Sequence, residues 1–483
     1  MMSRVCSLGE AMSTRSILSL LVAASLYLTG CPSDNGGGGA VPASGGTVVY
    51  LADQDIAGVF ELYLEGSGTK LNPALAVGRT ITSFALTPDA AAVVYIADQD
   101  QDDVFEIYRV NLASPGASTK LNGALVAGGD VVQLAVTADG TAVVYRADQT
   151  QDEVFELFRT LFNGGTNSKL NPPYTISQDV ETFVLLPDSS GVIYRADQAT
   201  DGVSELYRVL FATAGTSNPL INPPLFTGQN VDAFAATPDS ANVVYIANRP
   251  IGSNQIFIVP AGGGGSIPLN GPLVANGNAT AFSVTPDGLS VVYRADQDID
   301  EVYELYRTVI LSAPTNVKLN PTLAAGGDVE SFAVTPDSTS VVYRADQTTN
   351  DIVEIFRTVF SGNVNSQLNP SFPVTADVVD FALFPNGSGL VYKADQTTDG
   401  VDELYRVVLG FPGAPRVNPA LVIGQNVATY AVAPDSNSVI YRANQDNAGI
   451  VELYRAAFSS AGTSSKLNAP LVVGENVASF AVR

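Results

Sequence analysis

Short runs of alternating apolar and polar residues recur along this chain, and they predict β-strands. The runs are rich in valine, tyrosine, phenylalanine and isoleucine, which suit pleated, partly buried surfaces. Polar turns with Pro, Asp and Gly separate them, as in Thr285-Pro286-Asp287-Gly288. A helical period occurs only near the N-terminus, around the apolar run Ile17–Leu28. The pattern therefore predicts an all-β fold.

The strands belong to a unit that occurs nine times. It reads VVY-x-ADQ, then V-x-E-L-Y-R, then KLNP and SFAVTPD, and successive units start 45 to 51 residues apart. This period is the size of one four-stranded propeller blade. The anchor tyrosines of the nine units are Tyr50, Tyr95, Tyr145, Tyr194, Tyr245, Tyr293, Tyr343, Tyr392 and Tyr441.

Each unit predicts four strands. Val329–Val334 is typical of the first, Ser340–Asp346 of the second and Val302–Arg307 of the third, while KLN marks the fourth. The first unit starts at its second strand, and the chain finishes on a first strand, Val477–Arg483. We therefore expect a single β-propeller over residues 47–483, with about nine four-stranded blades and a ring closed by the C-terminal strand. Eight blades plus one displaced unit is the alternative.

Charged residues predict how the second and third strands pair. A hairpin centred on Ile299 would place Arg294 opposite Glu304, and opposite charges suit facing positions. We interpret such pairs as structural ion pairs within each blade. The same offset predicts the pairs Arg146–Glu156, Arg195–Glu205, Arg344–Glu354, Lys393–Glu403 and Arg442–Glu452.

The fifth unit differs from the others. Ile246 and Gln255 stand where the charged pair is expected, and Asn248-Arg249-Pro250 replaces ADQ. We interpret this difference as decay of the repeat, with a specialised surface as the alternative.

The N-terminal segment predicts export and lipidation. Ile17–Leu28 has the length of a signal-peptide core, and it leads into Leu28-Thr29-Gly30-Cys31, which resembles a bacterial lipobox. The resemblance implies a lipoprotein signal peptide over residues 1–30 and a diacylglyceryl anchor on Cys31. Residues 31–46 would be the lipidated cysteine and a Gly-rich tether. An ordinary signal peptide with a chance cysteine is the alternative, and translation starts at Met1 or Met12.

The residues after the cysteine bear on the compartment. Pro32 and Ser33 follow Cys31, so nothing resembles an inner-membrane retention signal. We expect a lipid-anchored protein of the bacterial cell envelope, at the outer membrane, on its periplasmic side or its surface.

The repeat also resembles that of TolB-type propellers, relatives of WD-type repeats. Thr285-Pro286-Asp287-Gly288 and Thr335-Pro336-Asp337 match the family's SPDG position, although Ser338 replaces the glycine in the second copy. Ala295-Asp296 and Ala345-Asp346 match its Ser-Asp position. The resemblance covers residues 47–483 and implies the fold rather than an activity. Unlike TolB itself, this chain is not expected to carry an α/β domain before the propeller.

Composition excludes several kinds of chemistry. The formal net charge of −24 disfavours nucleic acid as a partner. The chain has no histidine, which excludes Ser-His-Asp and Cys-His catalysis and the usual zinc sites. Its two cysteines, Cys6 and Cys31, both precede the repeats. We therefore expect no enzyme, and a histidine-free polysaccharide hydrolase or lyase is the least favoured alternative.

Acidic turns between the second and third strands are the remaining candidate site. Carboxylates at alternating positions of a short loop can bind a hard cation such as Ca²⁺. Aspartate also stabilises turns through its own side chain, and we favour that interpretation. The six residues concerned are Asp98, Asp100, Asp102, Asp296, Asp298 and Asp300.

Taken together, the sequence predicts a non-enzymatic, lipid-anchored envelope protein. Its propeller would act as an interaction scaffold for an envelope protein or a glycan, because binding residues commonly lie on loops held by a rigid fold. Membrane attachment would come from the lipid on Cys31. A Ca²⁺-binding surface protein is the alternative, and no other cofactor is expected.

Overall fold

The computed structural model describes residues 45–165, 167–175, 177–214, 218–249, 252–310, 315–372 and 375–483. The expected signal peptide, Cys31 and nearly all of the tether lie outside these residues. Within them, no helix is long and apolar enough to cross a membrane. The only helices there are the single 3₁₀ turns η1 (Phe211–Thr213) and η2 (Ser361–Asn363).

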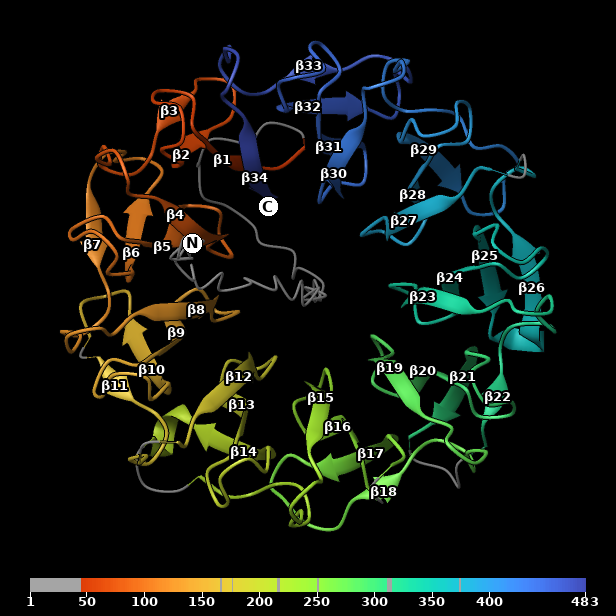
Figure 1. Ribbon diagram of the computed structural model, residues 1–483, viewed down its shortest axis with the longest axis horizontal. Coiled ribbons are helices and arrows are strands. Elements are labelled where there is room, and N and C mark those ends of the chain that lie inside the picture. Colours follow the sequence, from red (N-terminus) through yellow and green to blue (C-terminus); the bar gives the residue numbers. More distant parts are fainter. Residues whose placement is uncertain are drawn as a thin grey trace, which may run out of the picture. The chain divides into compact units, whose positions relative to one another are not determined.

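Nine antiparallel sheets form a ring around a central axis (Figure 1). This confirms the all-β propeller and its nine blades, which we number 1 to 9 from the blade that contains β1. In each blade, strands A to D run from the centre of the ring to its rim. Strand A is β34 (Val477–Val482), β4 (Ile81–Leu86), β8 (Val131–Val136), β12 (Val180–Leu185), β15 (Val231–Ala236), β19 (Ala279–Val284), β23 (Val329–Val334), β27 (Val378–Leu383) and β30 (Val427–Val432).

The next two strands of each blade form its centre. Strand B is β1 (Val48–Ala52), β5 (Ala92–Ala97), β9 (Ala142–Ala147), β13 (Gly191–Ala196), β16 (Asn242–Ala247), β20 (Ser290–Ala295), β24 (Ser340–Ala345), β28 (Gly389–Ala394) and β31 (Ser438–Ala443). Strand C is β2 (Glu61–Leu64), β6 (Glu106–Asn111), β10 (Glu156–Leu161), β14 (Glu205–Leu210), β17 (Gln255–Pro260), β21 (Glu304–Val309), β25 (Glu354–Val359), β29 (Glu403–Val408) and β32 (Glu452–Ala457).

Strand D, at the rim, is short. It is β3 (Thr69–Lys70), β7 (Ser118–Lys120), β11 (Ser168–Lys169), β18 (Ile267–Pro268), β22 (Val317–Lys318), β26 (Val364–Gln367) and β33 (Ser465–Lys466). In blades 4 and 8 it is reduced to the single bridges Tyr207–Leu220 and Tyr405–Arg416.

The C-terminal strand closes the ring, as the sequence predicts. β34 pairs antiparallel with β1, with Tyr50 opposite Phe480. At the end of this pair, Thr47 N donates to Arg483 O at 2.7 Å and Arg483 N donates to Thr47 O at 3.0 Å. Blade 1 is therefore built from both ends of the propeller.

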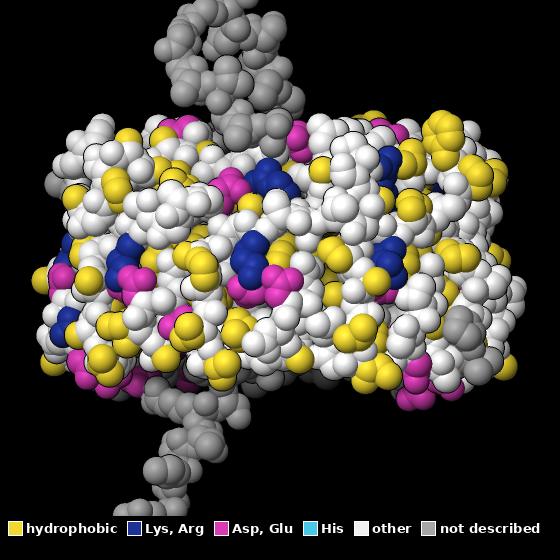
Figure 2. All heavy atoms as spheres, turned by 90° about the horizontal axis from the view of Figure 1, so that it is seen from above, with side chains coloured by type: hydrophobic (Ala, Val, Ile, Leu, Met, Phe, Trp, Pro, Cys, Tyr) yellow, Lys and Arg dark blue, Asp and Glu magenta, His cyan; other side chains and the backbone are white. Residues whose placement is uncertain are grey.

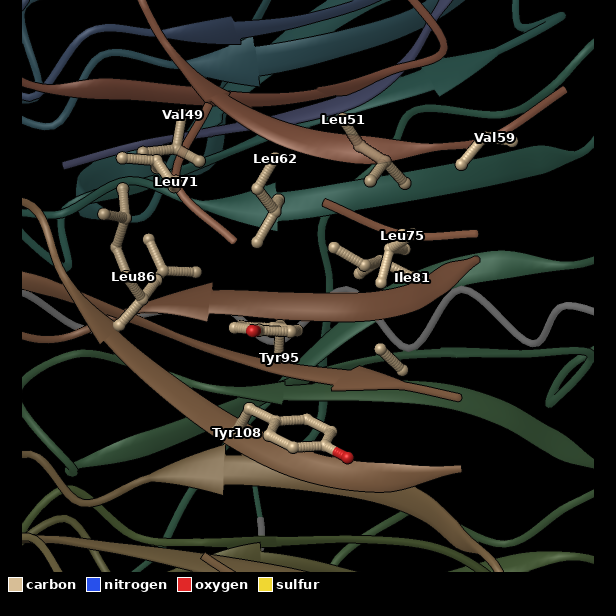
Figure 3. Packing of buried hydrophobic residues seen from close by; sticks show 13 residues of the cluster. Val49, Leu51, Val59, Leu62, Leu71, Leu75, Ile81, Leu86, Tyr95 and Tyr108 are labelled. Atoms are coloured by element: carbon tan, nitrogen blue, oxygen red, sulfur yellow. The ribbon is translucent and has the colours of Figure 1, made fainter. Parts of the chain in front are cut away.

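The hydrophobic core lies between blades rather than inside them. Nine clusters are present in the described part of the chain, and each joins neighbouring blades. Figure 3 shows the cluster in which Val49 and Leu62 of blade 1 pack with Tyr95 and Tyr108 of blade 2. The nine anchor tyrosines are fully buried in these clusters, and each stacks on an aromatic ring of strand C. A blade thus buries its faces only against its neighbours.

The predicted register of strands B and C is wrong by one residue. Arg294 lies opposite Leu305, and Glu304 lies opposite Ala295. A one-residue shift moves a side chain to the other face of the sheet, so the two charges point away from each other. The predicted pairs of the other blades fail in the same way. Burial decides the register, because it places Tyr293 opposite Tyr306 in the cluster between blades 5 and 6.

The arginine of strand B links neighbouring blades instead. Arg294 Nε donates to the carbonyl of Val329, the first residue of strand A in the next blade. Arg344 Nε likewise donates to Val378 O at 2.8 Å, and Arg442 Nε donates to Val477 O at 2.8 Å. The last of these bonds crosses the seam that closes the ring.

Carboxylates and amides at the start of strand A form a second link. Asp328 N donates to Asp346 Oδ1 in its own blade, and Asp328 Oδ1 accepts from Tyr303 N of the preceding blade at 2.7 Å. At the closing seam, Asn476 N donates to Asp53 Oδ1 of blade 1, and Asn476 Oδ1 accepts from Val451 N of blade 9. The aspartate of the ADQ motif is therefore part of the scaffold.

The serine that replaces the TolB-type glycine has a structural role. Ser338, in the A–B turn of blade 7, adopts a left-handed backbone conformation with φ 58°. Gly288 adopts the same conformation, with φ 71°, in the equivalent turn of blade 6. The Ser338 hydroxyl accepts a hydrogen bond from Asp287 N of the preceding blade at 3.0 Å. Ser189, Ser240 and Ser436 accept equivalent bonds. Some backbone strain is thus offset by a contact between blades.

Deleting Val477–Arg483 should open the ring, because it removes strand A of blade 1 and exposes the cluster between blades 9 and 1. We expect the melting temperature to fall by about 10 °C or more, as measured by circular dichroism. Val473→Ser, an exposed position in the loop before this strand, is the control and should leave the melting temperature unchanged. An unchanged melting temperature in the deletion would disprove the structural role of closure.

Candidate functional site

A buried glutamate at the start of strand C organises the rim of eight blades. Glu304 is 3% exposed, and its carboxylate accepts hydrogen bonds from Tyr306 Oη at 3.0 Å and Asn320 Nδ2 at 3.4 Å. Lys318 of strand D forms an ion pair with it, and Asn320 Oδ1 accepts from Leu305 N at 2.7 Å. The Glu-x-Tyr and Lys-x-Asn parts of the repeat are therefore one hydrogen-bonded group, here called the rim network.

Most glutamates of the rim network are paired with a cation. A lysine or arginine pairs with the glutamate in six blades, and around the rim such cations lie beside acidic side chains (Figure 2). In blades 1, 2, 6 and 9 the same lysine also contacts an aspartate of the B–C turn. Buried, partnered carboxylates of this kind stabilise a scaffold rather than provide free reactive groups.

The six aspartates proposed for Ca²⁺ have three different environments. Asp98 and Asp296 are buried and accept backbone hydrogen bonds from Thr80 N and Asn278 N. Asp100 and Asp298 lie within 2.8 Å and 3.5 Å of Lys120 and Lys318. Asp300 accepts from Asn276 Nδ2 at 3.4 Å, and Asp102 is exposed.

These contacts limit what the acidic turns can do. The hydrogen bond from Lys120 lowers the pKa of Asp100, as expected for a carboxylate held in an ion pair. No group of three or more acidic side chains positioned to hold a metal occurs in the residues that the structure describes. Calcium binding at these turns remains a prediction.

Blade 5 lacks the rim network. Gln255 replaces the glutamate, Phe257 the tyrosine and Pro268 the lysine, and in addition Arg249 replaces the glutamine of ADQ. An open surface pocket of about 470 Å³ is present at this place. Among the described residues it is lined by Gln229, Arg249, Gln255, Phe257, Ser266 and Pro268.

The loss of the ADQ glutamine leaves a tyrosine without its usual partner. In the eight other blades the anchor tyrosine donates to that glutamine, as Tyr293 Oη does to Gln297 Oε1 at 2.7 Å. Tyr245 Oη is buried and has no hydrogen-bond partner in the described structure. Desolvation raises the pKa of Tyr245, and the nearby Ser266 and Arg249 side chains offset part of this increase.

A second feature is a set of exposed aliphatic side chains on the D–A loops. Three consecutive loops, at residues 75–79, 421–425 and 471–475, connect blades 8, 9, 1 and 2. Their tips expose Val77, Val422, Ile423, Val472 and Val473 by 63% to 84%. We call the side of the ring that carries the D–A loops and B–C turns the D–A face, and the side with the A–B turns the A–B face.

Comparisons with known proteins do not identify a family. No protein-family model matches this chain, and no curated protein matches its sequence. An oligogalacturonate lyase solved in complex with manganese is 14% identical with a TM-score of 0.44, covering 76% of this chain and 98% of that protein. The putative TolB from Agrobacterium tumefaciens is 15% identical with a TM-score of 0.32, covering 52% and 83%.

Prolyl oligopeptidase B from Galerina marginata, in its apo form, is 12% identical with a TM-score of 0.46. The match covers 76% of this chain and 55% of the peptidase. Likenesses at these identities concern the propeller fold alone.

Sequence reasoning found only part of the features described above. It singled out Arg249 and Gln255 as unusual but missed Phe257, Ser266 and Pro268, which line the same cavity. The replacement of a repeated lysine by Pro268 was a readable signal, whereas the exposed loop tips depend on a backbone conformation that the repeat does not specify.

The rim network predicts that substitution at two equivalent positions, Glu304 and Gln255, changes the free energy of unfolding by different amounts. Glu304→Ala removes the acceptor for Tyr306, Lys318 and Asn320, and we expect a loss of about 2–4 kcal/mol in the free energy of unfolding. Gln255→Ala in blade 5, where no such partners exist, should cost less than about 1 kcal/mol. Urea unfolding of both variants measures the difference, and equal losses would contradict the network.

Proposed function

We propose that this protein is a non-enzymatic, lipid-anchored envelope protein whose propeller docks a protein partner through its D–A face. The observation that carries this proposal is the exposure of five aliphatic side chains on three consecutive D–A loops. Exposed apolar groups that gather on one side of a soluble fold are typical of protein contact sites. Acidic B–C turns on the same face would add charge selectivity for a basic partner.

The direction in which the chain enters the ring supports this choice of face. β34 runs from the loop 471–475 to Arg483, so its two ends lie on opposite sides of the ring. Thr47 hydrogen-bonds Arg483, and the segment leading from the N-terminus therefore joins the propeller on the A–B face. An anchor on Cys31 would therefore be attached on the A–B side of the ring and leave the D–A face free of the attachment point.

Cross-linking from each face tests the docking proposal. A photoreactive amino acid at Val473, on the D–A face of the closing seam, should capture one reproducible envelope protein in cells. The same group at Asp435, exposed in the A–B turn of blade 9, should not capture it. Val472→Ser with Val473→Thr should reduce capture from Ile423. Equal capture from the two faces, or none from the D–A face, would rule out docking by this surface.

Lipidation is tested separately. Cys31→Ser should move the protein from the membrane fraction to the soluble fraction, because two or three acyl chains supply stable anchoring. Cys6→Ser is the matched control and should leave the protein in the membrane fraction. Membrane retention of the Cys31→Ser variant would refute the anchor.

A further inference from the structure

Blade 5 combines a cavity with donors that have no acceptor. The Tyr245 hydroxyl is buried and unpaired, and the Arg249 guanidinium takes part in no ion pair in the described part of the chain. Arginine offers only donors, so it cannot accept from Tyr245 as glutamine does elsewhere. In the described part of the chain, Tyr245 Oη thus has no hydrogen bond and Arg249 has no carboxylate partner, although the Ser266 hydroxyl lies near Tyr245.

The charge of the cavity differs from that of the equivalent place in other blades. In blades 1, 2, 6 and 9, a glutamate and an aspartate lie beside the lysine, whereas none of the described residues that line the pocket of blade 5 is acidic. Although the formal net charge of the chain is −24, an arginine without an acidic neighbour offers a local positive charge to an anion. A carboxylate supplies two coplanar oxygens, which match the guanidinium geometry.

The remaining lining indicates what the carboxylate is attached to. Gln229, Gln255 and Ser266 present amide and hydroxyl groups, which hydrogen-bond hydroxyl groups of a ligand. Phe257 and Pro268 form an apolar wall suited to a saturated ring. The volume of about 470 Å³ lies in the lower half of the range of small-molecule sites, so the ligand is small.

We propose that this cavity, the blade 5 pocket, binds a small hydroxylated carboxylate on the scale of one sugar acid. The carboxylate lies on Arg249, and the hydroxyl groups contact the glutamine and serine side chains that line the pocket. This pocket is separate from the exposed loops at the closing seam, so its test does not depend on docking.

Titration calorimetry of the full chain with sodium D-glucuronate tests the proposal. We expect saturable binding with a Kd of about 1 mM, the scale for a ligand of this size in an open pocket. D-glucose, which has the ring but no carboxylate, should bind at least about tenfold more weakly. Equal binding of the two compounds, or no binding of glucuronate at about 50 mM, would overturn the proposal.

Three variants assign binding to the pocket. Arg249→Gln should weaken glucuronate binding about tenfold or more, whereas Arg79→Gln, a change of the same kind at a D–A loop of another blade, should not affect it. The triple variant Gln255→Glu, Phe257→Tyr and Pro268→Lys restores the rim network, so it should fill the pocket and abolish binding without lowering the melting temperature. Binding unchanged by Arg249→Gln or by the triple variant would place the ligand elsewhere and refute the proposal.

Discussion

The structure depends on one constraint, which is that a blade buries its two faces only against the neighbouring blades. Every hydrophobic cluster in the described part of the chain joins adjacent blades, and the cluster between blades 9 and 1 exists only because β34 returns to β1. Polar contacts also join neighbouring blades. Arg294 and Asp328 both reach across a seam, and Asn476 repeats the second contact where the ring closes. Stability in such a fold is a sum of repeats and their interfaces, so an open ring would lose one whole interface.

Most of the repeated motif is consequently used by the scaffold. The aspartate and glutamine of ADQ bind a backbone amide and the anchor tyrosine, and the glutamate, lysine and asparagine form the rim network. A net charge of −24 therefore says little about ligands, because many carboxylates already have partners. Candidate functional residues are therefore those that differ from the repeated motif and those at loop tips that make no scaffold contact.

The sequence predicts the fold well because its period, strand composition and unmatched ends all report the same closed ring. It fails on the register of strands B and C, because charge pairing favours one register whereas burial of Tyr293 against Tyr306 favours the register one residue away. The candidate surfaces were harder to predict. Exposure of Val473 depends on the course of a loop, and the cavity near Arg249 forms from residues that are up to 39 positions apart.

Blade 5 departs from the rim network further than the other described blades do. In blade 4, Leu220 replaces the lysine, and Glu205 keeps the hydrogen bond from Tyr207. In blade 7, Phe356 replaces the tyrosine and Gln367 the lysine, yet Thr348 and Gln367 both donate to Glu354 at 2.5 Å. In blade 8, Arg416 substitutes for the lysine. Blade 5 instead loses every charged member of the network while its apolar strands still pack on both sides. Partly exposed polar positions tolerate substitution better than the core does, so the loss of charge alone does not identify a ligand. What distinguishes blade 5 is the combination of this loss with Arg249 and the open pocket beside it.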